Sequence, residues 1–173
     1  MKAVGYRNSL PITDAQSLVD VEIPDPVPAA RDLLVSVKAI SVNPVDTKVR
    51  MRAAAGPGEI KVLGYDASGV VKAVGPEVKL FKPGDEVFYA GSIARPGTNS
   101  ELHAVDERIA GPKPRSLSFS QAAALPLTSI TAWELLFDPP RPGTGRHAAQ
   151  RLAAGPRRCR WRRFDYGPAS GAS

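Results

Sequence analysis

The stretch that decides the fold is Gly-Val-Val-Lys-Ala-Val-Gly-Pro-Glu-Val-Lys-Leu-Phe-Lys-Pro-Gly-Asp-Glu-Val, residues 69–87. It has two apolar ends separated by turn-forming residues, which is typical of two short strands and a tight connection. Gly75 and Gly84 are expected to adopt a positive φ in the turns, a conformation that suits glycine. Asp85 is expected to cap the turn before the second strand.

Working outward, alternation of apolar and polar residues predicts further short strands. The clearest is residues 33–40, which places Leu33, Val35 and Val37 on one face. Ser118 is expected to cap a first helix, and Pro126 suits the start of a second. The pattern predicts a mostly β fold with short helices (α+β), as a barrel or a sandwich. The predicted strands are residues 2–6, 18–23, 33–40, 69–74, 86–89 and 100–105, and the predicted helices are 119–124 and 125–137.

Charge divides the chain at Asp138. Residues 1–138 carry 15 Lys and Arg and 16 Asp and Glu, a net charge of −1. Residues 139–173 carry eight Arg, no Lys and one acid, a net charge of +7. This last segment is rich in Ala, Gly and Pro, so we expect a disordered tail that cannot bury enough apolar surface to fold. Its composition favours out-of-frame translation of a GC-rich gene over a genuine basic tail.

Composition excludes several classes of protein. No apolar run approaches the roughly 20 residues that span a bilayer, and the first residues do not have the pattern of a signal peptide. Cys159 is the only cysteine, which excludes an internal disulfide and a multi-cysteine zinc site. A cytoplasmic, reducing compartment is therefore expected, with no membrane partner.

Four motifs together resemble the N-terminal GroES-like catalytic domain of the medium-chain dehydrogenase/reductase superfamily. Besides residues 69–87, they are residues 41–48, residues 63–66 and residues 122–133. The resemblance covers nearly all of residues 1–138 and is closest to the quinone oxidoreductase-like branch, which includes zinc-type alcohol dehydrogenase-like proteins. It implies a partly open β-barrel and NADPH-dependent hydride transfer to a quinone or to an activated alkene or carbonyl compound.

The resemblance also implies which residues carry the chemistry. Asn43, Asp46 and Tyr65 are the catalytic candidates, because they offer an amide, a carboxylate and a phenol for orienting the acceptor. Asn43 and Thr128 are the candidates for binding the cofactor, since the corresponding segments of relatives pass near the nicotinamide. Three of these residues also have a structural alternative. Asn43 suits a turn before Pro44, Asp46 suits a helix start, and Tyr65 suits a half-buried position.

No zinc site is expected. Zinc-dependent relatives carry a Cys near the position of Asn43 and a His in a Gly-His-Glu motif, whereas this chain has Pro44 and Tyr65 there. Asp66 alone cannot hold a catalytic zinc, which needs three protein ligands. His103 is expected to be a half-exposed strand residue.

We expect no counterpart of the relatives' nucleotide-binding half in these 173 residues. A Rossmann domain needs several βαβ units of roughly 30 residues, and 35 residues follow Asp138. Residues 143–148 match G-x-G-x-x-A, but prolines precede them and Gly155-Pro156 follows. We therefore expect a truncated oxidoreductase that binds no NADPH and is inactive alone. The resemblance implies a small-molecule quinone or enone as the partner. Assembly into a homo-oligomer is compatible with the sequence.

The alternative is a non-enzymatic β domain whose Arg157–Arg163 cluster binds nucleic acid or another acidic partner, although nucleic acid is not favoured.

Overall fold

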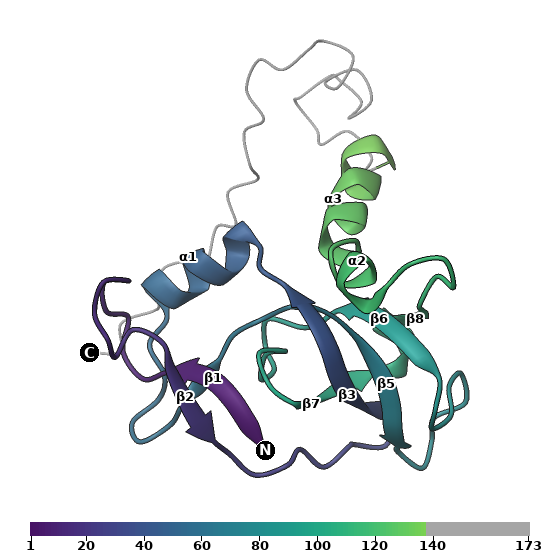
Figure 1. The fold of residues 1–173 in the computed structure, drawn as a ribbon, viewed down its shortest axis with the longest axis horizontal. Coiled ribbons are helices and arrows are strands. Elements are labelled where there is room, and N and C mark those ends of the chain that lie inside the picture. Colours follow the sequence, from purple (N-terminus) through teal and green to yellow (C-terminus); the bar gives the residue numbers. More distant parts are fainter. Residues whose placement is uncertain (138–173) are drawn as a thin grey trace, which may run out of the picture. The chain divides into compact units, whose positions relative to one another are not determined.

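A computed structural model describes residues 1–137 of the chain (Figure 1). Its internal contacts separate a compact unit, Met1–Thr131, from a second unit that begins at Ala132. Of this second unit the structure describes residues 132–137, the end of helix α3. The expected tail and the expected boundary after Asp138 lie outside the described residues.

Strands make up most of the first unit, and all six predicted strands are present with small shifts at their ends. The two predicted helices are also confirmed, whereas α1, β4 and β8 were not predicted. No helix of residues 1–137 is long and apolar enough to cross a membrane. The strands are β1 (Lys2–Tyr6), β2 (Val19–Glu22), β3 (Asp32–Ser41), β4 (Lys61–Val62), β5 (Asp66–Val74), β6 (Glu86–Ala90), β7 (Leu102–Asp106) and β8 (Ala110–Pro112), and the helices are α1 (Pro44–Arg52), α2 (Phe119–Ala123) and α3 (Pro126–Phe137), with a short 3-10 helix η1 (Glu107–Ile109).

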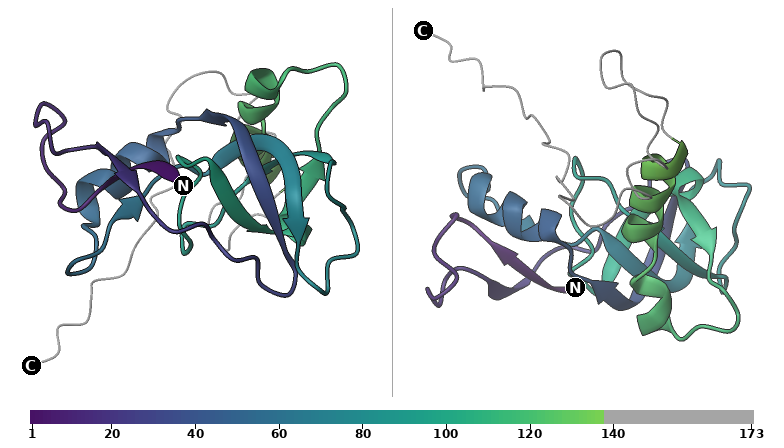
Figure 2. Two further views of the ribbon diagram at one scale, coloured as in Figure 1. Left: turned by 60° about the horizontal axis from the view of Figure 1, so that its bottom comes forward. Right: turned by 90° about the horizontal axis from the view of Figure 1, so that it is seen from above.

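The strands form two antiparallel sheets. One has the order β2-β1-β4 and the other β7-β3-β5-β6-β8. Figure 2 shows the small sheet beside α1, and α2 with the start of α3 beside the larger sheet. Both sheets are open, so the strands do not close into a barrel. The expected mostly β fold with short helices is therefore confirmed, with open sheets in place of a continuous barrel wall.

The core has two parts. The larger cluster lies on β3, β5 and their neighbours, where the predicted inward face of β3 is confirmed by Leu33 and Val35, both fully buried. The smaller cluster lies beside α1 and contains Tyr6, Val49, Leu63 and Tyr65. Residues from the second cluster border the candidate site described below.

The turn residues of the deciding stretch behave in two different ways. Gly84 has a φ of +95°, as predicted. Gly75 does not have a positive φ, so that prediction is wrong. Instead the Cα of Gly75 lies against the backbone of Ala29 and Ala30, and a Cβ there would collide with the carbonyl oxygen of Ala29. Asp85 caps its turn as predicted, because its carboxylate accepts the backbone N–H of Lys82 at 2.9 Å.

Candidate functional site

The predicted site lies where β3 ends and β5 begins. These strands are antiparallel and Ser41 pairs with Asp66, so the end of one strand lies beside the start of the other. Asn43 follows β3 and occupies the N-cap of α1, and Tyr65 immediately precedes β5. Residues far apart in the sequence are thereby brought together by the register of two neighbouring strands.

Asp46 joins the start of α1 to the segment that leads into β5. Its Oδ2 accepts the backbone N–H of Asn43 at 2.8 Å, which is one half of a capping box, and Pro44 occupies the first helical position. Its Oδ1 accepts the backbone N–H of Gly64 at 3.0 Å. Gly64 has a φ of +100°, a left-handed conformation that favours glycine. The expected alternative for Asp46, a helix-start residue, is therefore part of what it does.

Asp66, the first residue of β5, joins the site to α3. Its side chain is fully buried. Oδ2 accepts the side-chain Nδ2–H of Asn43 at 2.9 Å, and Oδ1 accepts the backbone N–H of Leu127 at 3.0 Å. Leu127 is the second residue of α3, and N–H groups in the first turn of a helix have no partner inside the helix. Asp66 thus satisfies one of these N–H groups.

Burial is the largest influence on both carboxyl groups. It raises the pKa of Asp46 and of Asp66, since a charged group loses hydration inside the protein. The N–H donors described above act in the opposite direction, and the nearby charge of Asp46 raises the pKa of Asp66 further. All four carboxylate oxygens accept an N–H, which is the bonding that the ionised form requires.

The other two predicted residues have different surroundings. Tyr65 is only 5% exposed and packs in the small cluster, so it is more buried than the half-buried alternative predicted. Thr128 is exposed on α3, and its hydroxyl group lies within hydrogen-bond distance of the carbonyl oxygens of Ala124 (3.0 Å) and Leu125 (2.9 Å). The Thr128 oxygen can still accept a hydrogen bond from a ligand.

Sequence reasoning missed the joining role of Asp66. The sequence offered one signal, an acidic residue three positions before the predicted strand 69–74 and a helix predicted to begin near Pro126, but it could not show that the two meet. Gly64 was also missed, because its N–H bond to Asp46 depends on a loop conformation. Both residues are found only once the register of β3 and β5 is known.

The donor set of this network does not fit a zinc ion. Within residues 1–137 there is no group of three His, Cys, Asp or Glu side chains placed to hold a metal. Asp46 and Asp66 use both oxygens on N–H donors, and His103 binds Tyr89 and Pro96 instead. Zinc would have to displace several of these bonds to obtain ligands.

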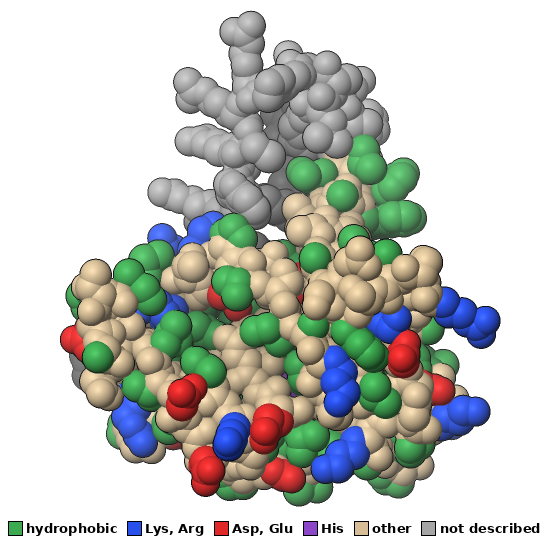
Figure 3. Space-filling model, in the orientation of Figure 1, with side chains coloured by type: hydrophobic (Ala, Val, Ile, Leu, Met, Phe, Trp, Pro, Cys, Tyr) green, Lys and Arg blue, Asp and Glu red, His purple; other side chains and the backbone are tan. Residues whose placement is uncertain are grey.

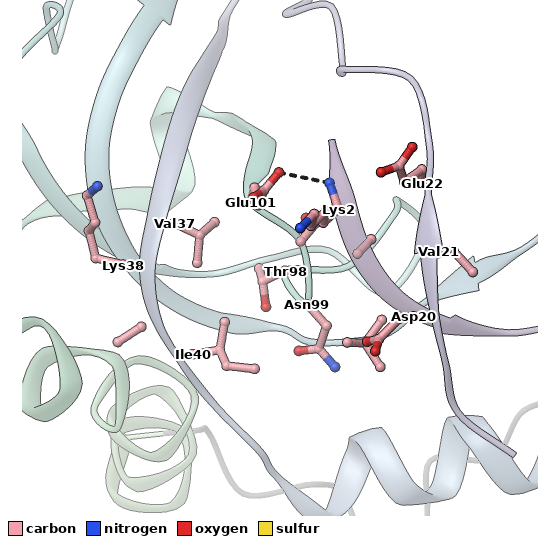
Figure 4. Close-up of a pocket in the computed structure, with 14 residues that line it drawn as sticks. Lys2, Asp20, Val21, Glu22, Val37, Lys38, Ile40, Thr98, Asn99 and Glu101 are labelled. Atoms are coloured by element: carbon pink, nitrogen blue, oxygen red, sulfur yellow. Dashed lines mark hydrogen bonds between the residues drawn. The ribbon is translucent and has the colours of Figure 1, made fainter. Parts of the chain in front are cut away.

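A surface hollow among the described residues lies elsewhere. It measures about 850 Å³ and lies between β1, β2 and the second half of β3 (Figure 4). Its walls carry apolar side chains and charged ones of both signs, such as Lys38, Asp20 and Glu101. None of the network residues lines it, so the hydrogen-bond geometry, and not the size of a hollow, defines the candidate site.

Comparison with known proteins finds relatives of one family. The family model "Alcohol dehydrogenase GroES-like domain" matches residues 29–125. A "Zinc-type alcohol dehydrogenase-like protein" of Staphylococcus aureus is 45% identical over 139 residues, which are 80% of this chain and 41% of that protein. The human mitochondrial "NAD(P)H oxidoreductase" RTN4IP1 is 40% identical, with 61% of this chain and 30% of that protein covered.

Solved structures agree with these matches. A Rhizobium etli protein described as a zinc-dependent alcohol dehydrogenase is 63% identical, with a TM-score of 0.77 and with 83% of this chain and 43% of that chain covered. The Escherichia coli quinone oxidoreductase, solved in complex with NADPH, is 32% identical, with a TM-score of 0.68 and 80% and 41% covered. The chain therefore spans less than half the length of these relatives and matches their N-terminal part.

Proposed function

The chain belongs to the alcohol dehydrogenase GroES-like domain family, and we propose that residues 1–137 form the substrate-side half of a zinc-independent, NADPH-dependent oxidoreductase. The family comprises NAD(P)H-dependent oxidoreductases. The proposed reaction is transfer of a hydride to a quinone or to an activated alkene or carbonyl compound. The sequence similarity to a quinone oxidoreductase supports this choice of acceptor.

One observation carries the zinc-independent part of the proposal. In the network of Asn43, Asp46 and Asp66, every carboxylate oxygen is already bonded to an N–H group. What remains available for a ligand is a hydrogen-bond donor rather than a metal ligand. The Nδ2 group of Asn43 carries two N–H bonds, of which one points to Asp66, so the second can orient a carbonyl oxygen.

The residues then have separate tasks in the proposed site. Bound NADPH would supply the hydride. Asn43 orients the acceptor or the nicotinamide amide, and Asp46 holds the backbone of Asn43 in place. Thr128 accepts a hydrogen bond from the nicotinamide amide, and Tyr65, whose ring packs in the small cluster, offers its phenol to the acceptor. Each group is held by the fold before a ligand arrives, which reduces the cost of orienting the reactants.

In this proposal the described residues contact only the nicotinamide end of the cofactor. All strand pairs in residues 1–137 are antiparallel, whereas a dinucleotide fold places the phosphates after a parallel βαβ unit. The proposal therefore includes that residues 1–137 do not oxidise NADPH by themselves. The G-x-G-x-x-A match at residues 143–148 lies outside the described residues.

A nuclear magnetic resonance titration of the 173-residue chain tests the proposal. Nicotinamide mononucleotide and a soluble quinone should shift the amide signals of Asn43, Gly64 and Thr128. Thr128→Val should reduce the nicotinamide shifts, whereas Thr131→Val is the matched control, because the Thr131 hydroxyl also bonds within the helix, to Leu127 at 2.8 Å. Shifts confined to the hollow of Figure 4, or steady NADPH oxidation at 340 nm by the chain alone, would contradict it.

A further inference from the structure

Asp66 is the one side chain of the site that touches three structural elements. It begins β5, accepts the Asn43 amide before α1, and accepts the Leu127 N–H at the start of α3. We propose that Asp66 is a positioning residue that couples the orientation of the Asn43 amide to the placement of the α3 N-terminus. The value of this coupling for catalysis rests on the proposed function, in which Asn43 and Thr128 contact the ligands.

The chemistry of the groups fixes the direction of each bond. An ionised carboxylate only accepts hydrogen bonds, so the atom of Asn43 that faces Asp66 must be the Nδ2 donor and not Oδ1. The Asn43 amide therefore has one orientation as long as Asp66 is in place. The two donors bond to different oxygens of Asp66. Replacing the carboxylate by an amide turns one of these oxygens into an NH2 donor, so the N–H group that faces it would lose its bond.

The position of Asp66 on β5 explains why its side chain can reach α3. Side chains at i and i+2 of a strand lie on the same face. Ser68 is two residues after Asp66, is also fully buried, and donates its hydroxyl hydrogen to the carbonyl oxygen of Phe119 at 2.6 Å. One face of β5 thus holds α2 through Ser68 and α3 through Asp66. The two polar residues are a natural pair for comparison, because each holds a different helix.

The position also shows what Asp66 does in place of metal binding. The Leu63–Asp66 segment resembles the Gly-His-Glu motif of zinc-dependent relatives, in which the acidic residue lies next to a metal ligand. Here both oxygens of Asp66 are bonded to a side-chain amide and a helix N-terminus. A carboxylate at the N-terminus of a helix is favoured by the partial positive charge there.

Hydrogen exchange in the complete 173-residue chain tests the coupling without any nucleotide or quinone. In Asp66→Asn, the Leu127 amide should exchange at least about tenfold faster than in the unmodified chain. Ser68→Ala is the matched control, and it should leave Leu127 within about twofold while exchange in α2 increases. Equal effects of both variants on Leu127 would overturn the proposal.

A second variant separates coupling from simple helix capping. Asn43→Ala removes the other donor to Asp66, so under the proposal the Leu127 amide should exchange at least about threefold faster. If Asp66 only capped α3, Asn43→Ala would leave Leu127 unchanged, and that result would overturn the proposal. The combined variant Asn43→Ala with Asp66→Asn should then exchange no faster than Asp66→Asn alone.

Measurements on the unmodified chain keep the proposal testable even if Asp66→Asn does not fold. The Leu127 amide and one Nδ2 proton of Asn43 should both be protected from exchange, and exchange of either at the rate of a solvent-exposed amide would overturn the proposal. Since no ligand is present, these outcomes are independent of the nicotinamide and quinone titrations. Failure of the ligand titrations would remove the proposed function and leave the coupling in place.

Discussion

His103 on β7 is a residue whose hydrogen bonds fix its protonation. Its Nε2 lies 3.0 Å from the carbonyl oxygen of Pro96, and its Nδ1 lies 3.1 Å from the hydroxyl group of Tyr89. A carbonyl only accepts, so Nε2 carries the hydrogen and Nδ1 accepts from Tyr89. The side chain is 5% exposed, so the expectation of a half-exposed residue is wrong. The Pro96 carbonyl oxygen lies against the imidazole, and the Tyr89 ring stacks on it.

The neutral state of His103 predicts a loss of stability in mild acid. Burial, together with the charge of Arg95, lowers the His103 pKa to about 4 despite the opposing effects of Pro96 and Asp32. His103 binds a proton near pH 6.5 in the unfolded chain and only near pH 4 in the folded chain. The free energy of unfolding should therefore fall as the pH decreases through this window, by about 2 kcal/mol at pH 5 relative to pH 7.5. Urea unfolding at the two pH values measures the difference.

The variant His103→Gln is the control for this pH dependence. It cannot titrate, so the contribution of residue 103 to the difference between pH 7.5 and pH 5 should disappear. Asp46 and Asp66 contribute with the opposite sign, because their folded pKa values are raised and protonation then favours the folded state. Their contribution is the same in both proteins. An unchanged pH dependence in His103→Gln would contradict the assignment.

At the scale of elements, Tyr6 joins β1 to the end of α1. Its ring is fully buried against Val49, and its hydroxyl hydrogen is donated to the carbonyl oxygen of Ala53 at 2.6 Å. Ala53 follows the last turn of α1, where carbonyl groups lack partners inside the helix. The C-terminus of the helix is therefore held by a strand of the small sheet, while its N-terminus is held by Asp46.

Tyr6→Phe should loosen the end of α1 without unfolding it. The ring packing is kept, but the Ala53 carbonyl loses its donor, so we expect the free energy of unfolding to fall by about 1–2 kcal/mol. Amides in the last turn of α1 should exchange faster. Tyr89→Phe is the control, because it makes the same chemical change in the larger core cluster and should leave the α1 amides unaffected. Equal exchange in α1 for both variants would show that the Tyr6 hydroxyl does not hold the helix.

The strands were predictable because their signal is local. In β3 the alternation of Leu33, Val35 and Val37 follows from the period of two that any half-buried strand shows. Helix α1 was missed because its sequence has mean hydropathy too low, and too little apolar periodicity, to stand out from a turn. Its start does carry sequence signals, since Asn43 and Asp46 have the capping-box spacing and Pro44 occupies the first helical position. Without an apolar face behind them, these signals did not distinguish a helix from a turn.

The candidate site was predictable only in part. Asn43 and Asp46 were found by motif position, and the structure places them in one hydrogen-bond network with Asp66. The bonds of Asp66 join residues 23 and 61 positions apart in the sequence. Such contacts depend on strand register and on where α3 begins. The sequence alone specifies the residue types, and the tertiary fold decides which of them meet.

At the scale of the whole molecule, charge is unevenly distributed along the sequence. Residues 1–138 are close to neutral and the last 35 residues carry a net charge of +7. On the face shown in Figure 3, basic and acidic side chains of the described residues are interspersed, with no large patch of one sign. This pattern differs from the basic surface that a nucleic-acid-binding domain usually presents. The Arg157–Arg163 cluster lies outside the described residues.

We expect the folding of the whole chain to be independent of metal. The two apolar clusters and the antiparallel ladders hold the described residues together, and the carboxylates that resemble part of a zinc motif are saturated by N–H donors. A structural zinc contributes its binding free energy to folding, so its removal by a chelator lowers the midpoint of thermal unfolding. Here the midpoint of thermal unfolding should stay within about 1 °C after treatment with EDTA, and elemental analysis should find only a small fraction of a zinc ion per chain.

The variant Asp66→Asn serves as the internal comparison. It should lower the midpoint through the lost hydrogen bond, equally with and without EDTA. Retention of about one zinc per chain, or a chelator effect that Asp66→Asn abolishes, would mean that Asp66 binds metal after all.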